Sequence, residues 1–320
     1  MGKVAFVFPG QGSQFAGMGR DLAHAYAEAR EVFARAEAAL GEDLSRLCFE
    51  GPEAQLKLTA NTQPAILTVS LACHAVLAAR GARCDGVAGH SLGEYSAIGA
   101  AGGASVEDLE RTVRRRGELM QEAVPVGVGA MSAVVGPSRA DVEAACREAS
   151  TEKEVVIAAN FNAPEQTVIA GHAAAVARAG ELLDARGAKR VLPLPVSAPF
   201  HSPLMVPARR GMEPVLAALE LADLGVPLYN NVDAKPVTAA DAVRDGLVRQ
   251  IDAPVRWVEI VERMVADGFD TFVEVGPGSV LSGLVKRIAR GATLVQVGTP
   301  EQVEGFLPRG LSARTGGGAG

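Results

Sequence analysis

Three short apolar runs in this sequence each lead into a turn that contains glycine. The runs, each with the turn that follows it, are residues 4–8 with Pro9-Gly10-Gln11-Gly12, residues 86–89 with Gly89-His90-Ser91-Leu92-Gly93, and residues 271–275 with Gly276-Pro277-Gly278. Longer helical patterns separate these runs, and alternating strands and helices predict a parallel sheet covered by helices. Because ligands bind outside the carboxyl ends of the strands in such sheets, we expect the three turns to converge at one site.

The middle of the chain has a different order of elements. It reads as strand 129–136, helix 138–149, strands 154–159 and 166–170, helix 172–186 and strand 189–194. This β-α-β-β-α-β order is typical of a ferredoxin-like unit. We therefore expect an α/β protein whose large domain has a mostly parallel sheet with flanking helices. The predicted boundaries are 1–126 and 197–312 for the large domain, 127–196 for an inserted ferredoxin-like subdomain, and 313–320 for a disordered tail.

The composition excludes several classes of protein. A chain of 320 residues that is 48% hydrophobic and carries a net charge of −6 is not a disordered chain. The mild acidity and the 4% of aromatic residues argue against nucleic acid as a partner. No uninterrupted apolar run reaches about 18 residues, so we expect no membrane span. The four cysteines show no C-x-x-C pairing, no cluster of metal ligands stands out, and the N-terminus lacks a signal-peptide pattern. These features favour a cytoplasmic protein without disulfides or a bound metal.

The pentapeptide Gly89-His90-Ser91-Leu92-Gly93 matches the pattern G-x-S-x-G. A serine in this pattern lies on a tight turn between a strand and a helix, which exposes its hydroxyl. The backbone N–H of the next residue can then form half of an oxyanion hole. In a glycine-rich chain the same pentapeptide can also be a purely structural turn.

A serine nucleophile needs a neighbouring base, and His201 is the strongest candidate among the five histidines. It follows the predicted insertion, whereas His24 and His74 lie in helical patterns and His172 begins a helix. His90 adjoins the serine, but neighbouring side chains on a sharp turn usually point apart. A simple loop histidine remains the alternative interpretation of His201.

Arg116 lies in a predicted helix over 105–121, close to its apolar face. At about 100° per residue, Arg116 falls about 20° from Leu109, at the edge of the arc that should be buried. A buried guanidinium stays protonated and needs an anionic partner. The partner is either a carboxylate of the protein, in a structural salt bridge, or the carboxylate of a substrate held by two parallel hydrogen bonds.

These residues belong to a larger set of motifs that extends to about residue 298. The motifs are Phe8-Pro9-Gly10-Gln11-Gly12-Ser13-Gln14, Gly89-His90-Ser91-Leu92-Gly93-Glu94-Tyr95-Ser96, Arg116 with Met120-Gln121-Glu122-Ala123, Asn160-Phe161-Asn162, His201, Asn230-Asn231-Val232 and Glu274-Val275-Gly276-Pro277-Gly278. In this combination the chain resembles the malonyl-CoA:acyl carrier protein transacylases of fatty-acid synthesis. The resemblance implies the same fold, a large α/β domain with a ferredoxin-like insertion.

The resemblance also implies a role for each matching residue. Ser91 would be the nucleophile, His201 the general base, and the backbone N–H groups of Gln11 and Leu92 the oxyanion hole. The remaining roles would be Arg116 for the malonyl carboxylate, the main-chain carbonyl of Gln250 for orienting the histidine, Asn160 and Asn162 for the pocket wall, and Phe200 for excluding branched acyl groups such as methylmalonyl. No cofactor is implied.

The partners implied are malonyl-CoA and an acidic acyl carrier protein, with the enzyme as a monomer. Docking two acidic proteins requires a local basic surface. The candidates are Lys189 with Arg190, Lys286 with Arg287 and Arg290, and also Arg209 with Arg210. Three alternatives stay open at this point. They are a thioesterase or esterase that uses the same serine, a stand-alone acyltransferase of polyketide synthesis, and a carrier-binding scaffold without activity.

Overall fold

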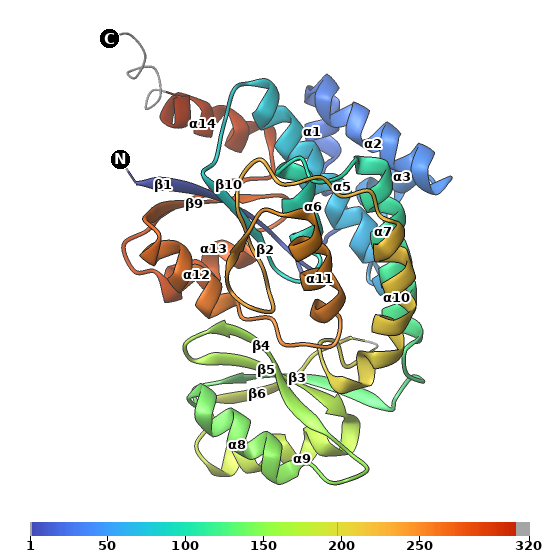
Figure 1. The fold of residues 1–320 in the computed structure, drawn as a ribbon, viewed down its shortest axis with the longest axis vertical. Helices are drawn as coiled ribbons and strands as arrows, with labels where there is room; N and C mark the ends of the chain where they lie inside the picture. Colours follow the sequence, from blue (N-terminus) through green and yellow to red (C-terminus); the bar gives the residue numbers. More distant parts are fainter. Residues whose placement is uncertain (1, 197, 312–320) are drawn as a thin grey trace.

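The computed structural model describes residues 2–196 and 198–311, and it contains two sheets (Figure 1). The larger sheet has the strand order β10-β9-β1-β2-β7-β8. Its strands are β1 (Lys3–Phe8), β2 (Gly86–Gly89), β7 (Leu228–Tyr229), β8 (Pro236–Val237), β9 (Phe269–Val275) and β10 (Thr293–Val297). All neighbours pair in parallel except β7 and β8, which pair antiparallel. The predicted mostly parallel sheet is confirmed.

The smaller sheet has the strand order β4-β5-β3-β6. It consists of β3 (Gly129–Val135), β4 (Val156–Ala163), β5 (Gln166–His172) and β6 (Arg190–Pro193), and helices α8 (Arg139–Ala149) and α9 (Ala173–Ala185) complete the unit. All three pairings are antiparallel. Figure 1 shows this unit below the larger sheet, with α8 and α9 on its outer face. The ferredoxin-like fold is therefore confirmed, and we propose 127–196 as the extent of the subdomain.

The remaining helices cover the larger sheet or pack on one another. They are α1 (Arg20–Ala25), α2 (Ala27–Leu40), α3 (Leu44–Glu50), α4 (Glu53–Leu56), α5 (Thr59–Ala79), α6 (Gly93–Ala100), α7 (Val106–Glu122), η1 (Pro203–Met205), α10 (Val206–Ala218), α11 (Ala240–Gln250), α12 (Trp257–Ala266), α13 (Val280–Ile288) and α14 (Pro300–Leu311). One apolar cluster includes Phe8 and Leu71, and a second, around Trp257 and Phe272, lies against α12 and α13. The predicted tail, 313–320, lies outside the described residues.

Helix α5 is long and apolar enough to cross a membrane by length and composition, alone among the helices of the described residues. However, 78% of its most apolar window is buried inside the protein. Polar side chains on it, such as Thr68 and Ser70, are buried as well. Helix α5 is thus a core helix around which α2 and α7 pack.

Helix α7 begins as predicted and brings Arg116 into the interior. The side chain of Ser105 caps the helix by accepting a hydrogen bond from the Asp108 N–H. Leu109, Val113 and Met120 are buried on the side of α7 that includes Arg116, which is 1% exposed. The apolar spacing of this helix therefore places a permanent cation in the core.

Candidate active site

The three glycine turns meet at the carboxyl ends of β1, β2 and β9, as predicted. A Cβ atom on Gly10 would lie 2.3 Å from the carbonyl oxygen of His90, and one on Gly276 would lie 3.0 Å from Pro9 Cγ. A side chain at Gly10 would overlap the backbone of His90, and one at Gly276 would crowd the Pro9 ring, so the three turns lie in close contact. The buried Glu274 accepts hydrogen bonds from the N–H groups of Leu281 and Ser282, which joins the third turn to α13.

Ser91 lies on a strained turn between β2 and α6. Its φ is 51°, in the left-handed region that non-glycine residues rarely adopt. Such a conformation costs on the order of 1–3 kcal/mol and persists only where the surroundings determine it. A Cβ on Gly89 would lie 1.9 Å from the carbonyl oxygen of Gly93, so only glycine fits there. Leu92 caps α6 at its N-terminus, where backbone N–H groups have no partner within the helix.

His201 contacts Ser91 on one side and a main-chain carbonyl on the other. Its Nε2 lies 2.7 Å from Ser91 Oγ, and its Nδ1 lies 2.9 Å from the carbonyl oxygen of Gln250. Because a carbonyl only accepts, Nδ1 carries the proton and Nε2 is free to accept one from Ser91. Burial, with the nearby Arg116 charge, lowers the pKa of His201 to about 3, so the ring is neutral at pH 7.

Arg116 is a buried cation without a carboxylate partner. Its Nη1 donates to Gln63 Oε1 (2.8 Å), and its Nη2 donates to Gln250 Oε1 (2.7 Å) and to Ser91 Oγ (3.1 Å). Among the described residues, no Asp or Glu lies within ion-pair distance of it. Its Nε is buried and has no hydrogen-bond partner in the part of the chain that the structure describes. The structural salt bridge considered from the sequence is therefore wrong.

A cavity of about 160 Å³ opens between these residues and the smaller sheet. The predicted site residues that line it are Gln11, Ser91, Leu92, Arg116, Asn160, Asn162, Phe200 and His201. The other lining residues are Gln63, His90, Met120, Met131, Val168, Leu194 and Val196. Gln250 lies behind this wall, fully buried. The large domain thus contributes the reactive groups, and β4, β5 and the segment after β6 complete the cavity.

Residues of β4 and the segment before His201 form much of that second wall. Asn160 and Phe200 are both buried, at 6% and 8% exposure. The side chain of Asn162 accepts a hydrogen bond from His90 Nε2 at 2.8 Å. His90 thus has its own partner, although it lines the same cavity as Ser91.

The four basic residues proposed for docking lie outside the cavity wall. Lys189, Arg190, Lys286 and Arg287 are all exposed. Lys189 forms an ion pair with Glu165 at 3.1 Å. Lys286 and Arg287 lie in the last turn of α13. The structure therefore brings the eight cavity residues together and leaves the basic pairs on the surface.

Sequence reasoning gave no role to three buried residues of the site, Gln63, Glu94 and Asn231. Glu94 and Asn231 belong to two of the motifs named above, so the sequence contained a signal that could have found them. Gln63 lies on the apolar helix α5, and nothing in its surroundings marks it. Among the described residues, no group of three or more His, Cys, Asp or Glu side chains could hold a metal ion.

Comparison with protein families and known proteins identifies the relatives of this chain. The model of the acyl transferase domain matches residues 5–313. The malonyl CoA-acyl carrier protein transacylase of Escherichia coli K12 is 49% identical over 308 residues, which cover 96% of this chain and 99% of that protein. The protein of the same name from Bacillus subtilis is 45% identical and covers 95% of this chain and 96% of that protein.

Solved structures lead to the same group. An acyl carrier protein S-malonyltransferase from Vibrio cholerae superposes with a TM-score of 0.93 at 46% identity, over 95% of this chain and 99% of that one. A malonyl-transacylase in complex with a type II polyketide acyl-carrier protein superposes with a TM-score of 0.93 at 44% identity, over 96% of this chain and 99% of that one. The chain therefore belongs to the acyl transferase domain family, within its malonyl CoA-acyl carrier protein transacylase group.

Proposed function

We propose that this chain transfers the malonyl group of malonyl-CoA to the phosphopantetheine thiol of an acyl carrier protein, through a malonyl ester of Ser91. One observation carries the choice of malonyl. The buried guanidinium of Arg116 has no carboxylate of the protein within ion-pair distance among the described residues, yet it donates to the hydroxyl of Ser91. A substrate whose own carboxylate lies one carbon from the reacting carbonyl would supply the missing anion beside the nucleophile.

The first half-reaction forms the ester. His201 Nε2 takes the Ser91 proton while Ser91 Oγ attacks the thioester carbonyl of malonyl-CoA. The tetrahedral oxyanion accepts hydrogen bonds from the backbone N–H groups of Gln11 and Leu92, and each such donor is worth roughly 3–4 kcal/mol. The C–S bond then breaks, and His201 returns the proton to the CoA sulfur. The carbonyl of Gln250 holds the imidazole in the required tautomer throughout.

The second half-reaction repeats these steps with a different acceptor. The thiol of the carrier protein gives its proton to His201 and attacks the malonyl ester. The C–O bond to Ser91 then breaks, and His201 returns the proton to Ser91 Oγ. Fatty-acid synthesis in the cytoplasm is the proposed setting. The basic pairs Lys286 with Arg287 and Lys189 with Arg190 are the proposed docking surfaces for the carrier.

We propose that the second wall of the cavity selects the acyl group. Phe200 is a bulky ring beside His201, and we propose that it crowds a branched acyl group such as methylmalonyl. Asn160 and Asn162 supply polar groups on β4 that line the same cavity. Unbranched malonyl fits this proposal because its only large substituent is the carboxylate directed at Arg116.

A polyketide carrier is a second candidate for the acceptor. One structural relative, at 44% identity, is a malonyl-transacylase in complex with a type II polyketide acyl-carrier protein. The chemistry at Ser91 would be the same. Turnover measured with a fatty-acid carrier and with a polyketide carrier at equal concentrations distinguishes the two pathways by their kcat/KM.

The covalent intermediate gives the test of the proposed function. Wild type mixed with malonyl-CoA should gain the mass of one malonyl group on the peptide that contains Ser91, and Ser91→Ala should gain none. Persistence of the adduct in Ser91→Ala would refute the assignment. Malonate released in the absence of carrier protein, as fast as transfer in its presence, would instead identify a hydrolase.

A further inference from the structure

Asn231 contacts two backbone groups of the turn that leads into Ser91. Its Oδ1 accepts a hydrogen bond from the Ser91 N–H, and its Nδ2 donates to the carbonyl oxygen of Gly89, both at 2.7 Å. Asn231 is fully buried in the loop between β7 and β8. A single amide side chain therefore bridges the two peptide groups that flank His90, directly before the positive φ of Ser91.

The side chain of Gln250 contacts the same turn at the peptide group that follows the Cα atom of Ser91. Gln250 Nε2 donates to the carbonyl oxygen of Ser91 at 3.0 Å. One carboxylate oxygen of the buried Glu94 joins the two supports, because it accepts from Gln250 Nε2 (2.8 Å) and from the Asn231 N–H (3.1 Å). Both the N–H and the C=O of Ser91 are thus engaged by side chains that share one buried acid.

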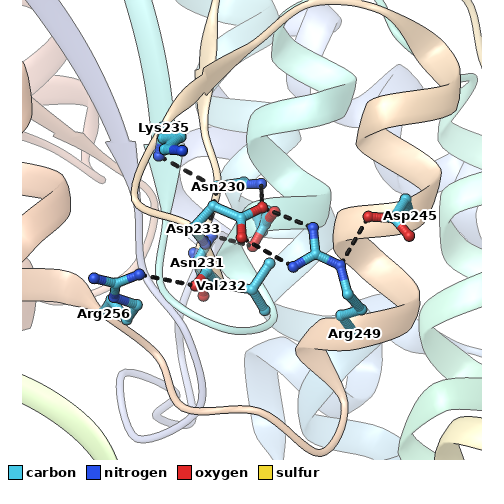
Figure 2. Close-up of polar contacts among 9 residues, drawn as sticks. Asn230, Asn231, Val232, Asp233, Lys235, Asp245, Arg249 and Arg256 are labelled. Carbon is cyan, nitrogen blue, oxygen red and sulfur yellow. Dashed lines mark hydrogen bonds and ion pairs between the residues drawn. The ribbon is translucent and has the colours of Figure 1, made fainter.

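The loop that carries Asn231 is anchored to the helix that carries Gln250. Arg249 donates to both carboxylate oxygens of Asp233, at 2.9 and 2.7 Å, as Figure 2 shows. Two parallel bonds of this kind restrict the relative orientation of the groups that they join. Arg249 directly precedes Gln250, whose carbonyl contacts His201. The supports of the serine and of the histidine therefore belong to one connected unit.

We infer that Asn231 is a positioning residue, which holds the Ser91 peptide in the strained conformation that directs its hydroxyl at His201. The inference rests on the proposed role of Ser91 as the nucleophile. A non-glycine residue keeps a positive φ only where its surroundings determine it, and Asn231 satisfies the Ser91 N–H that the strain would otherwise leave without a partner.

The test compares two asparagines of the same loop. Asn230 and Asn231 are both buried, but within the described residues the side chain of Asn230 makes its hydrogen bonds to Asp233 and Lys235 of its own loop and none to the Ser91 turn. Asn231→Ala should slow formation of the malonyl adduct about 10- to 100-fold at saturating malonyl-CoA, because a small misplacement of a reacting group has that effect. Its KM for malonyl-CoA should stay near that of wild type, since Arg116 and Gln63 are untouched. Asn230→Ala should lower Tm but keep the wild-type rate of adduct formation.

Each outcome decides the inference. Wild-type adduct formation by Asn231→Ala, or an equal slowing by Asn230→Ala, overturns it. Should Asn231→Ala fail to fold, Asn231→Asp decides, because it keeps an acceptor for the Ser91 N–H and loses the donor to Gly89. Asn231→Asp should form the adduct more slowly than wild type, and a full wild-type rate would overturn the inference. An adduct in Ser91→Ala would instead refute the proposed function itself.

Discussion

Helix α7 buries two ionisable side chains, Glu110 and Arg116, in opposite ways. Glu110 is fully buried, and burial raises its pKa to about 8, so it is protonated at pH 7. As an acid it can donate to the Thr68 hydroxyl, 2.5 Å away, and that hydroxyl can donate to the carbonyl of Pro64. Arg116 cannot discharge itself in this way, because guanidinium stays protonated in proteins.

The difference shows how a buried charge can indicate function. A carboxyl removes the cost of burial by taking up a proton, so Glu110 needs no ligand. Arg116 keeps its charge, and its partners are two amide oxygens and the hydroxyl of Ser91. Neutral acceptors offset only part of the cost of desolvating a cation. A carboxylate that arrives with the substrate would complete the neutralisation.

The largest expected effect separates the two residues by activity. Arg116→Ala should lower kcat/KM for malonyl transfer about 100-fold or more, since it removes two charge-assisted hydrogen bonds of about 1.5–3 kcal/mol each. Glu110→Gln should change it by less than about twofold, because it alters a neutral contact away from the cavity. Steady-state transfer to the carrier protein measures both values. Similar losses of kcat/KM in the two variants would contradict the claim that only Arg116 serves the reaction.

The next largest effect concerns how the contribution of Glu110 to stability changes with pH. In the unfolded chain Glu110 ionises near its ordinary pKa of 4.5, whereas in the folded protein it keeps its proton until about pH 8. Between these values the folded state binds more protons, so the contribution of Glu110 to stability falls as pH rises. The Tm of Glu110→Gln should therefore fall less than the Tm of wild type when the pH rises from about 5 to about 8.5.

Glu118→Gln on the same helix is the matched control. The Glu118 side chain is 38% exposed and pairs with Arg115 on the surface. Its change in Tm between the two pH values should follow that of wild type, as expected for a surface ion pair. If the Tm of Glu110→Gln changes with pH as much as the Tm of wild type, Glu110 is not protonated at pH 7.

The smallest expected effect concerns the exposed cations. Reversing the charge of Lys286 and Arg287 to Glu should raise the KM for carrier protein about 3- to 10-fold, because complementary charges guide the encounter of two proteins. The KM for malonyl-CoA should not change. The same reversal at Lys189 and Arg190 should act less, since Lys189 is already paired with Glu165. A constant KM for carrier in both double variants would exclude both surfaces.

The fold followed from the sequence where elements were long or periodic. The strands β1, β2 and β9 end in glycine turns, and the β-α-β-β-α-β order of the subdomain has clear boundaries. Strands β7 and β8 escaped prediction because each has only two residues. Their pairing depends on the loop between them, which is held by contacts with α11 that no local pattern reveals.

The site followed from the sequence only in part. The burial of Arg116 could be predicted from the spacing of Leu109 and Val113, which is a local property of one helix. Its partners Gln63 and Gln250 come from α5 and α11, so their convergence requires the tertiary fold. The same holds for Asn231, whose contact with Ser91 joins positions far apart in the chain.

The selectivity of Arg116→Ala between two acyl groups tests the central claim most directly. Wild type and Arg116→Ala would be compared for the rate of acyl-Ser91 formation from malonyl-CoA and from acetyl-CoA. Acetyl lacks the carboxylate, so its rate should stay the same or increase in the variant, while the ratio of malonyl to acetyl falls about 100-fold or more. Equal losses for both acyl groups would contradict the role of Arg116 as the partner of the substrate carboxylate.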